Sequence, residues 1–285
     1  MFAVRRTLNC KGRLLSLERP IVMGILNTSP DSFYDGGRYQ SLDAALRQTE
    51  QMLSEGAAII DVGGMSSRPG AAQISIQEEL RRVLPVIEAI AGRFPEAFIS
   101  IDTVHAQTAR EAVAAGACIV NDISAGRLTE GMYETVAELG VPYVLMHMQG
   151  RPETMQQQAQ YDDVVQEVLD FLIAEVGRLQ AAGVKDILLD PGFGFGKTME
   201  HNFQLLQNLH VLGILPYPVL AGISRKSMIY RSLGISPKEA LNGTTALHIV
   251  ALQQGALLLR VHDVAEAVQV VRLWEQLQSA QYSPA

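Results

Sequence analysis

The sequence has few cysteines and no long hydrophobic run. Its 285 residues include only two cysteines, Cys10 and Cys118, without CxxC spacing or neighbouring histidines, which argues against a disulfide framework or a structural zinc site. No apolar run approaches the roughly 20 residues that cross a bilayer. Residues 1–15 contain neither a continuous apolar core nor a small-residue cleavage site. We therefore expect a cytoplasmic protein with no membrane partner.

Positive charge is also scarce. The formal net charge is -7, which argues against a general nucleic-acid surface and favours small-molecule partners. What the chain does have is hydrophobic residues, at 48% of the total. This content excludes disorder as the main state and is sufficient for one large core.

Short β-branched runs alternate with helical segments along the chain. The runs that predict buried parallel strands are 20–26, 57–63, 97–102, 117–122, 142–147, 186–190, 218–224 and 256–262. Between them, hydrophobic residues recur three and four positions apart, most clearly over 164–179. Eight such units without a linker predict an α/β fold, a (β/α)8 TIM barrel in a single domain over 20–280. Residues 1–19 are predicted to form a short N-terminal hairpin that closes the barrel.

Polar and glycine-rich residues follow each predicted strand. They occur at NTSPDSFYDGG (27–37), GGMSSRPG (63–70), DT (102–103), ND (121–122), HMQGRP (147–152), DPGFGFGKT (190–198), SRKS (224–227) and RVHD (260–263). In a barrel these segments meet at the C-terminal face, where barrel enzymes build their active sites. An aspartate that ends a strand can instead cap the next helix, and this alternative applies to Asp102 and Asp122.

The glycine-rich segment 190–198 matches no standard phosphate loop. Pro191 stands where a Walker A loop has its first glycine, and the spacing of Gly192, Gly194 and Gly196 misses the dinucleotide pattern. The segment therefore predicts a loop whose backbone approaches a flat ligand.

Charged residues on this face indicate the chemistry of the ligand. The cations expected there indicate a substrate with phosphate charge, and they are Arg68, Arg225, Lys226, Arg260 and His262. The strand-end residues Asp102, Asn121 and Asp190 suit a ring that carries several N–H donors, with a metal site as the competing interpretation.

Among the histidines, only two follow strands. We interpret His147 and His262 as candidates for the site. The other histidines are interpreted as surface residues on helices or loops, and they are His105, His201, His210 and His248.

The strand-end segments, in this order from residue 27 to 264, closely resemble those of bacterial dihydropteroate synthases. NTSPDSFYDGG, DPGFGFGKT and GISRKSMI are the most specific of them. The resemblance implies a transferase of folate synthesis. Such an enzyme joins 6-hydroxymethyl-7,8-dihydropterin pyrophosphate to p-aminobenzoate and releases pyrophosphate.

The resemblance also implies roles for individual residues. Those that would hydrogen-bond the pterin are Asp102, Asn121, Asp190 and Lys226, with Arg260 stacked along it. Asn27 would bind Mg2+, and Ser67, Arg68 and His262 would surround the pyrophosphate. Ser227 would take the p-aminobenzoate carboxylate, and the walls of that ring would be Phe33, Pro69 and Phe195. The residues expected to act in catalysis are Arg68, Asp102, Asp190, Lys226 and His262. A homodimer is implied by the family and by the Val- and Leu-rich segment 264–277.

Two loops depart from the family pattern, and the change in the first, Thr28-Ser29 in place of the common Val-Thr, is mild. Met65 and Ser67 stand where the family usually has glutamate and threonine, so one anchoring charge is lost while the hydroxyl is kept. A pterin-binding methyltransferase module would need a corrinoid partner and no pyrophosphate clamp, and Arg68 and SRKS argue against it. A non-catalytic pterin-binding paralogue is the second alternative, indicated only by the changed loop.

Overall fold

Eight parallel strands close into a barrel. The computed structural model describes residues 4–28, 37–65, 74–150, 155 and 159–280. Around the barrel the strand order is β10-β3-β4-β5-β6-β7-β8-β9. The bounds are β3 (Ile21–Asn27), β4 (Ile59–Gly63), β5 (Phe98–Asp102), β6 (Ile119–Asp122), β7 (Tyr143–Met146), β8 (Ile187–Asp190), β9 (Val219–Ala221) and β10 (Ala256–Val261). The predicted TIM barrel is confirmed, with a strand inside each of the eight predicted runs or within one residue of it.

Strand β9 ends three residues before the predicted run does. The backbone turns after Ala221, where the N–H of Lys226 donates to the carbonyl of Ile223 and Arg225 adopts a φ of +53°. The end of the predicted run is therefore a turn and not part of the strand.

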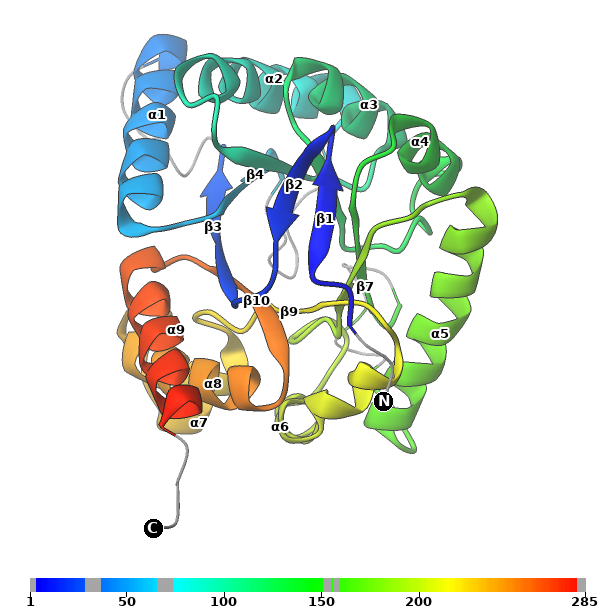
Figure 1. The fold of residues 1–285 in the computed structure, drawn as a ribbon, viewed down its shortest axis with the longest axis vertical. Helices are drawn as coiled ribbons and strands as arrows, with labels where there is room; N and C mark the ends of the chain where they lie inside the picture. Colours follow the sequence, from blue (N-terminus) through cyan, green and yellow to red (C-terminus); the bar gives the residue numbers. More distant parts are fainter. Residues whose placement is uncertain (1–3, 29–36, 66–73, 151–154, 156–158, 281–285) are drawn as a thin grey trace.

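A ring of helices surrounds the strands (Figure 1). The helices are α1 (Gly37–Glu55), α2 (Ile76–Arg93), α3 (Ala106–Ala115), α4 (Met132–Leu139), α5 (Val164–Ala182), α6 (Met199–Gln207), α7 (Ser227–Leu233), α8 (Leu241–Gln253) and α9 (Val264–Ser279), with short 3-10 turns at Leu209–Ile214 and Pro237–Glu239. Local signals fix their ends, as in α5, where Asp163 accepts hydrogen bonds from the N–H groups of Val165 and Gln166 and Gly183 ends the helix in a left-handed conformation.

Across the described ranges, we find no helix with both the length and the apolar character needed to cross a membrane.

The alternation of side chains along each strand determines what lies inside the barrel. On β4, Ile59 packs in the inner cluster while Ile60 and Val62 pack against the helices. The inner cluster also contains Ile119 and Leu188. Because side chains on a strand alternate, the residue two positions further along points to the same face. The position two beyond each inner apolar residue is therefore the upper layer of the barrel interior.

An N-terminal hairpin covers the opposite end of the barrel. Strands β1 (Thr7–Cys10) and β2 (Arg13–Ser16) pair antiparallel and cross the centre of the ring in Figure 1. Their buried residues Leu8 and Leu15 pack in the same inner cluster as Ile59 and Leu188. The side chains of Lys11 and Arg13 donate to backbone carbonyls of the barrel, at Val113 and at Pro95, Glu96 and Ala97 respectively.

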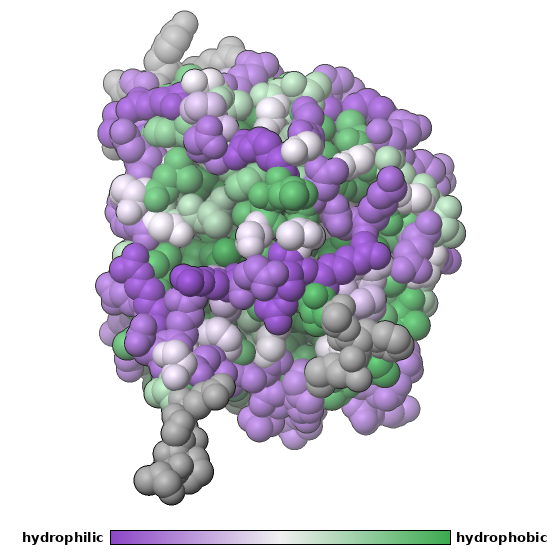
Figure 2. All heavy atoms as spheres, viewed as in Figure 1, coloured by the Kyte–Doolittle hydropathy of each residue, from purple (hydrophilic) through white to green (hydrophobic). Residues whose placement is uncertain are grey.

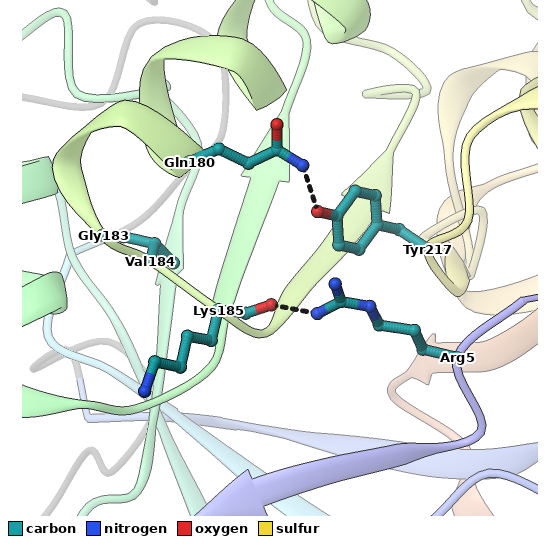
Figure 3. A pocket seen from close by; sticks show the side chains of 6 residues that line it. All are labelled: Arg5, Gln180, Gly183, Val184, Lys185 and Tyr217. Carbon is teal, nitrogen blue, oxygen red and sulfur yellow. Dashed lines mark hydrogen bonds between the residues drawn. The ribbon is translucent and has the colours of Figure 1, made fainter.

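Two cavities lie at this hairpin end. One, of about 440 Å³, is lined mostly by apolar residues of 53–58 and 94–98. Figure 2 shows hydrophobic residues gathered on this face beside a band of hydrophilic ones. The other, of about 450 Å³, is lined by Arg5, Gln180, Gly183, Val184, Lys185 and Tyr217. In Figure 3 the Gln180 amide donates to the Tyr217 hydroxyl, and Arg5 reaches the carbonyl of Lys185. Neither cavity includes any of the predicted site residues.

Candidate active site

Arg260 connects three strands at the mouth of the barrel. Its Nε donates to Oδ2 of Asp61 and its Nη2 to Oδ2 of Asp102, each at 2.7 Å. The Nδ2 of Asn121 also donates to Oδ2 of Asp61, at 3.1 Å. These residues lie on β10, β4, β5 and β6. Arg260, Asp61 and Asn121 each follow an inner apolar residue by two positions, and Asp102 follows the buried Ser100. The alternation of the strands thus assembles the cluster from positions far apart in the sequence.

Burial and charge act against each other in this cluster. Burial alone would lower the pKa of Arg260, but the charges of Asp61 and Asp102 raise it, so the guanidinium stays protonated. Burial raises the pKa of Asp102, and Arg260 opposes that rise. The result is a fixed cation held between two carboxylates, with the Asn121 amide beside them.

Asp190 and Lys226 form the second part of the site. Asp190 ends β8, and its Oδ1 accepts the N–H of Gly192 at 2.7 Å. Burial raises the pKa of Asp190, with the Lys226 charge opposing, while burial lowers the pKa of Lys226 to about 8, with Asp190 opposing. The Lys226 ammonium donates to the carbonyl of Phe193 and lies 4.5 Å from the centroid of the Phe195 ring. This side of the mouth therefore offers an acceptor, a cation and an aromatic ring.

The remaining predicted residues are divided between described and undescribed positions. Asn27 is exposed at the end of β3, and Ser227 begins α7. His262 is exposed just after β10, and its backbone N–H donates to Oγ of Ser224 at 3.2 Å. The other predicted site residues lie outside the described residues, and they are Phe33, Ser67, Arg68 and Pro69.

No group of three His, Cys, Asp or Glu side chains in the described part of the chain is arranged to hold a metal ion. Asn27 supplies a single exposed carboxamide oxygen at the mouth. Mg2+ commonly takes one or two protein oxygens and completes its shell with water and substrate phosphates. The donor set is therefore compatible with Mg2+ bound together with a phosphorylated ligand.

The structure gives different roles to Asp102 and Asp122, the two strand-end aspartates for which helix capping was the alternative. Asp122 accepts hydrogen bonds from Ser124 N–H, Gly126 N–H and the Tyr143 hydroxyl, so it stabilises the turn after β6. Asp102 instead pairs with Arg260. Neither aspartate caps the next helix, because α3 and α4 begin after His105 and Gly131 without a side-chain cap; Asp122 stabilises a turn instead.

Two other expectations are corrected. Arg225 points away from the site, because its Nε and Nη2 bind both carboxylate oxygens of Asp263 at 2.7 and 2.8 Å. His248 is not a surface residue: it is 1% exposed on the inner side of α8.

Sequence reasoning missed Asp61 and Lys197, both buried within the site region. Asp61 lies in the apolar run AAIIDVG, where its inward position in the strand alternation is the signal that identifies it. Lys197 ends the glycine-rich segment and is 3% exposed.

Met65, the departure from the family pattern, packs half-buried against an apolar cluster at the mouth. The cluster consists of Val104, Ile123, Met146, Met148, Met155 and Phe195. An apolar residue thus stands against an apolar surface at this position.

Comparison with known proteins gives one consistent family. The pterin binding enzyme family matches residues 23–262. The dihydropteroate synthase of Escherichia coli K12 is 50% identical over 273 residues, which cover 95% of this chain and 96% of that protein. The structure of the Xanthomonas albilineans dihydropteroate synthase with 4-aminobenzoic acid has a TM-score of 0.91 and 45% identity, covering 97% of this chain and 99% of that one. A structure of the same synthase with 7,8-dihydropteroate has a TM-score of 0.87 and 43% identity, covering 96% and 100%.

Proposed function

The chain belongs to the dihydropteroate synthases of the pterin-binding enzyme family, and we propose that the polar cluster at the mouth of its barrel performs their reaction. The reaction joins 6-hydroxymethyl-7,8-dihydropterin pyrophosphate to p-aminobenzoate. A bond from the pterin methylene carbon to the amine nitrogen forms, the bond from that carbon to the pyrophosphate oxygen breaks, and the amine loses a proton.

The pterin would lie in the upper layer of the barrel interior. Asp102, Asn121 and Asp190 line this layer, and they offer acceptors for the N–H donors of a pterin ring. Lys226 adds a donor on the same side as Asp190. Arg260, held in place by Asp61 and Asp102, would stack along the ring. The convergence of these strand-end groups in one layer is the observation that supports the assignment.

The pyrophosphate would lie nearer the exposed rim. Asn27 and His262 are exposed there, at the ends of the adjacent strands β3 and β10. Ser67 and Arg68 would join them from the segment after β4. Mg2+ bound at Asn27 would supply positive charge to offset that of the pyrophosphate.

The reaction depends mainly on electrostatic stabilisation of developing charge, and less on proton transfer by side chains. An electron-rich dihydropterin can carry the positive charge that develops as pyrophosphate departs. The carboxylates of Asp102 and Asp190 would stabilise that charge, since hydrogen bonds already fix them before the reaction. Ser227 and the Phe195 ring would hold p-aminobenzoate so that its amine attacks the carbon before water does.

We expect steady-state pyrophosphate release from the pterin substrate to require both p-aminobenzoate and Mg2+. A coupled pyrophosphate assay, run with and without p-aminobenzoate and with a chelator, measures this directly. Release that is indifferent to p-aminobenzoate, or absent with all components present, would instead favour the methyltransferase or non-catalytic alternatives.

We expect p-aminobenzoate to bind weakly to the free protein and measurably once a pterin ligand, Mg2+ and pyrophosphate are present. The reason is that segments 27–37 and 63–70 would supply residues to both sites, with Asn27 and Arg68 at the anion and Phe33 and Pro69 at the ring. Binding is then coupled, and p-aminobenzoate must also tighten pyrophosphate binding. Calorimetric titration with and without pyrophosphate and Mg2+ tests this. Equal affinities would indicate a preformed pocket, to which the packing of Met65 would contribute.

We also propose a cytoplasmic homodimer. Helix α9 exposes Leu273 and Leu277, one turn apart, at 63% and 61%. Such neighbouring exposed leucines favour burial against a second copy of the chain.

A further inference from the structure

Lys197 is a buried lysine at the end of the glycine-rich loop 191–197. Its Nζ lies 3.0 Å from the carbonyl oxygen of Gly192, 3.1 Å from that of Phe195 and 2.8 Å from Nδ1 of His147. The Nζ donates to the two carbonyls, with the carbonyl of His147 a longer contact at 3.5 Å, and a third N–H, which the ammonium form has, can point to Nδ1 of His147. Burial lowers the pKa of Lys197 well below its usual value, with Asp190 opposing. The lysine therefore ties two carbonyls of its own loop to a side chain of the neighbouring β7 loop.

His147 is buried against the same loop. Its ring packs edge-on against Phe171, with centroids 4.8 Å apart, and burial lowers its pKa to about 2. The ring is therefore neutral, and its Nδ1 is available to accept from Lys197. His147 is buried beneath the glycine-rich loop, and its contact with that loop runs through Lys197.

The loop backbone lies directly on the β7 loop. A Cβ at Gly192 would be 1.8 Å from the carbonyl oxygen of His147, and one at Gly196 would be 2.6 Å from Cβ of Gln149. Tyr161 donates to the carbonyl of Gly196, and Asn202 accepts the N–H of Gly194. The conformation of the loop is thus fixed from beneath.

From above, the same loop presents groups to the site. The Phe195 ring, 9% exposed, lies under the Lys226 ammonium, whose Nζ donates to the carbonyl of Phe193. We propose that Lys197, together with His147, is a positioning residue for p-aminobenzoate, because it fixes the Phe195 carbonyl and so the place of the ring against which the substrate packs. This rests on the proposed assignment of Phe195 to the p-aminobenzoate site.

Lys197→Met retains the length of the side chain and removes the three donors. We expect the KM for p-aminobenzoate to rise about threefold to tenfold, the range that corresponds to losing one aromatic packing contact. The KM for the pterin substrate and the kcat at saturating p-aminobenzoate should stay within about twofold. Lys185→Met, at an exposed lysine on the hairpin side, is the matched control and should leave all three constants unchanged.

If Lys197 only stabilises the fold, Lys197→Met should lower the melting temperature without raising the KM for p-aminobenzoate more than the KM for the pterin substrate. If both KM values rise together, or neither rises, the positioning role is overturned. His147 gives a second route should Lys197→Met fail to fold. His147→Asn keeps an acceptor near Nδ1 and should retain most of the affinity for p-aminobenzoate, while the isosteric His147→Leu should reproduce the rise in KM. Equal KM values in these two variants would contradict the proposal.

Phe195→Leu distinguishes failure of this inference from failure of the assignment beneath it. An unchanged KM for p-aminobenzoate in Phe195→Leu would remove Phe195 from the substrate site. A raised KM there, with none in Lys197→Met, would reject only the positioning role. If Phe195 contacts p-aminobenzoate and Lys197 positions it, Lys197→Met should raise the KM for p-aminobenzoate little further in the Phe195→Leu background. The two changes then remove the same contact.

Discussion

Asp190→Asn is expected to weaken the binding of a pterin ligand by about thirtyfold or more. One carboxylate oxygen of Asp190 already accepts the Gly192 N–H. The other is left as an acceptor for ring N–H groups, and in asparagine that position becomes an amide donor that faces another donor. An unpaired buried polar group costs about 2 kcal/mol, which corresponds to this change in affinity.

Titration calorimetry with a pterin analogue measures the effect. The matched control is Asp186→Asn, just before β8, where the side chain accepts the N–H of Asn9 at 3.0 Å and an amide oxygen can do the same. Unchanged affinity in Asp190→Asn, accompanied by a lower melting temperature, would reduce Asp190 to a turn-stabilising residue.

Arg260→Met is expected to lower the free energy of unfolding by about 3–5 kcal/mol, as is typical when one partner of a buried ion pair is removed. Asp61 is fully buried and the Asp102 side chain is 13% exposed, and both lose their shared cation. Urea unfolding at neutral pH gives the difference. Arg110→Met breaks an exposed pair with Glu138 and should cost about 1 kcal/mol or less.

The loss in Arg260→Met should depend on pH in one direction. Burial already raises the pKa of Asp102, and Arg260 is the charge that opposes the rise. Without the Arg260 charge, Asp102 in the folded protein binds a proton more tightly than in the unfolded chain. The stability of the variant therefore falls as pH rises through the raised pKa of Asp102. The deficit should therefore shrink toward acid pH. A deficit below about 1 kcal/mol at neutral pH would mean that the two carboxylates have other compensation.

The barrel was predictable because buried parallel strands are nearly continuous apolar runs. Because Asp61 is a charged residue inside such an apolar run, it was not identified as a site residue. Its partner Arg260 is 199 positions away, and only the closure of the barrel brings β10 to β3 and β4. Strand ends could be located from local composition, while the pairing of their side chains could not.

Lys197 and His248 show that the sequence does not indicate which way a side chain outside the strands points. The spacing of segment 190–198 excluded a Walker loop, but nothing local indicates that Lys197 turns inward to His147, 50 positions earlier. His248 lies on a helix whose hydrophobic residues are spread around it, so periodicity does not indicate which side is buried. For Phe33, Ser67, Arg68 and Pro69, which lie outside the described residues, the roles remain predictions from the sequence.

Three cationic side chains at the N-terminal end hold the hairpin against backbone carbonyls of the barrel. Lys11, Arg13 and Arg5 all donate to carbonyl oxygens, at residues such as Val113, Glu96 and Lys185. Every amino acid supplies that oxygen, so substitutions at the accepting positions would leave these three contacts in place. Among the hydrogen bonds of the hairpin described above, only the one to Asp186 depends on a side chain of the barrel.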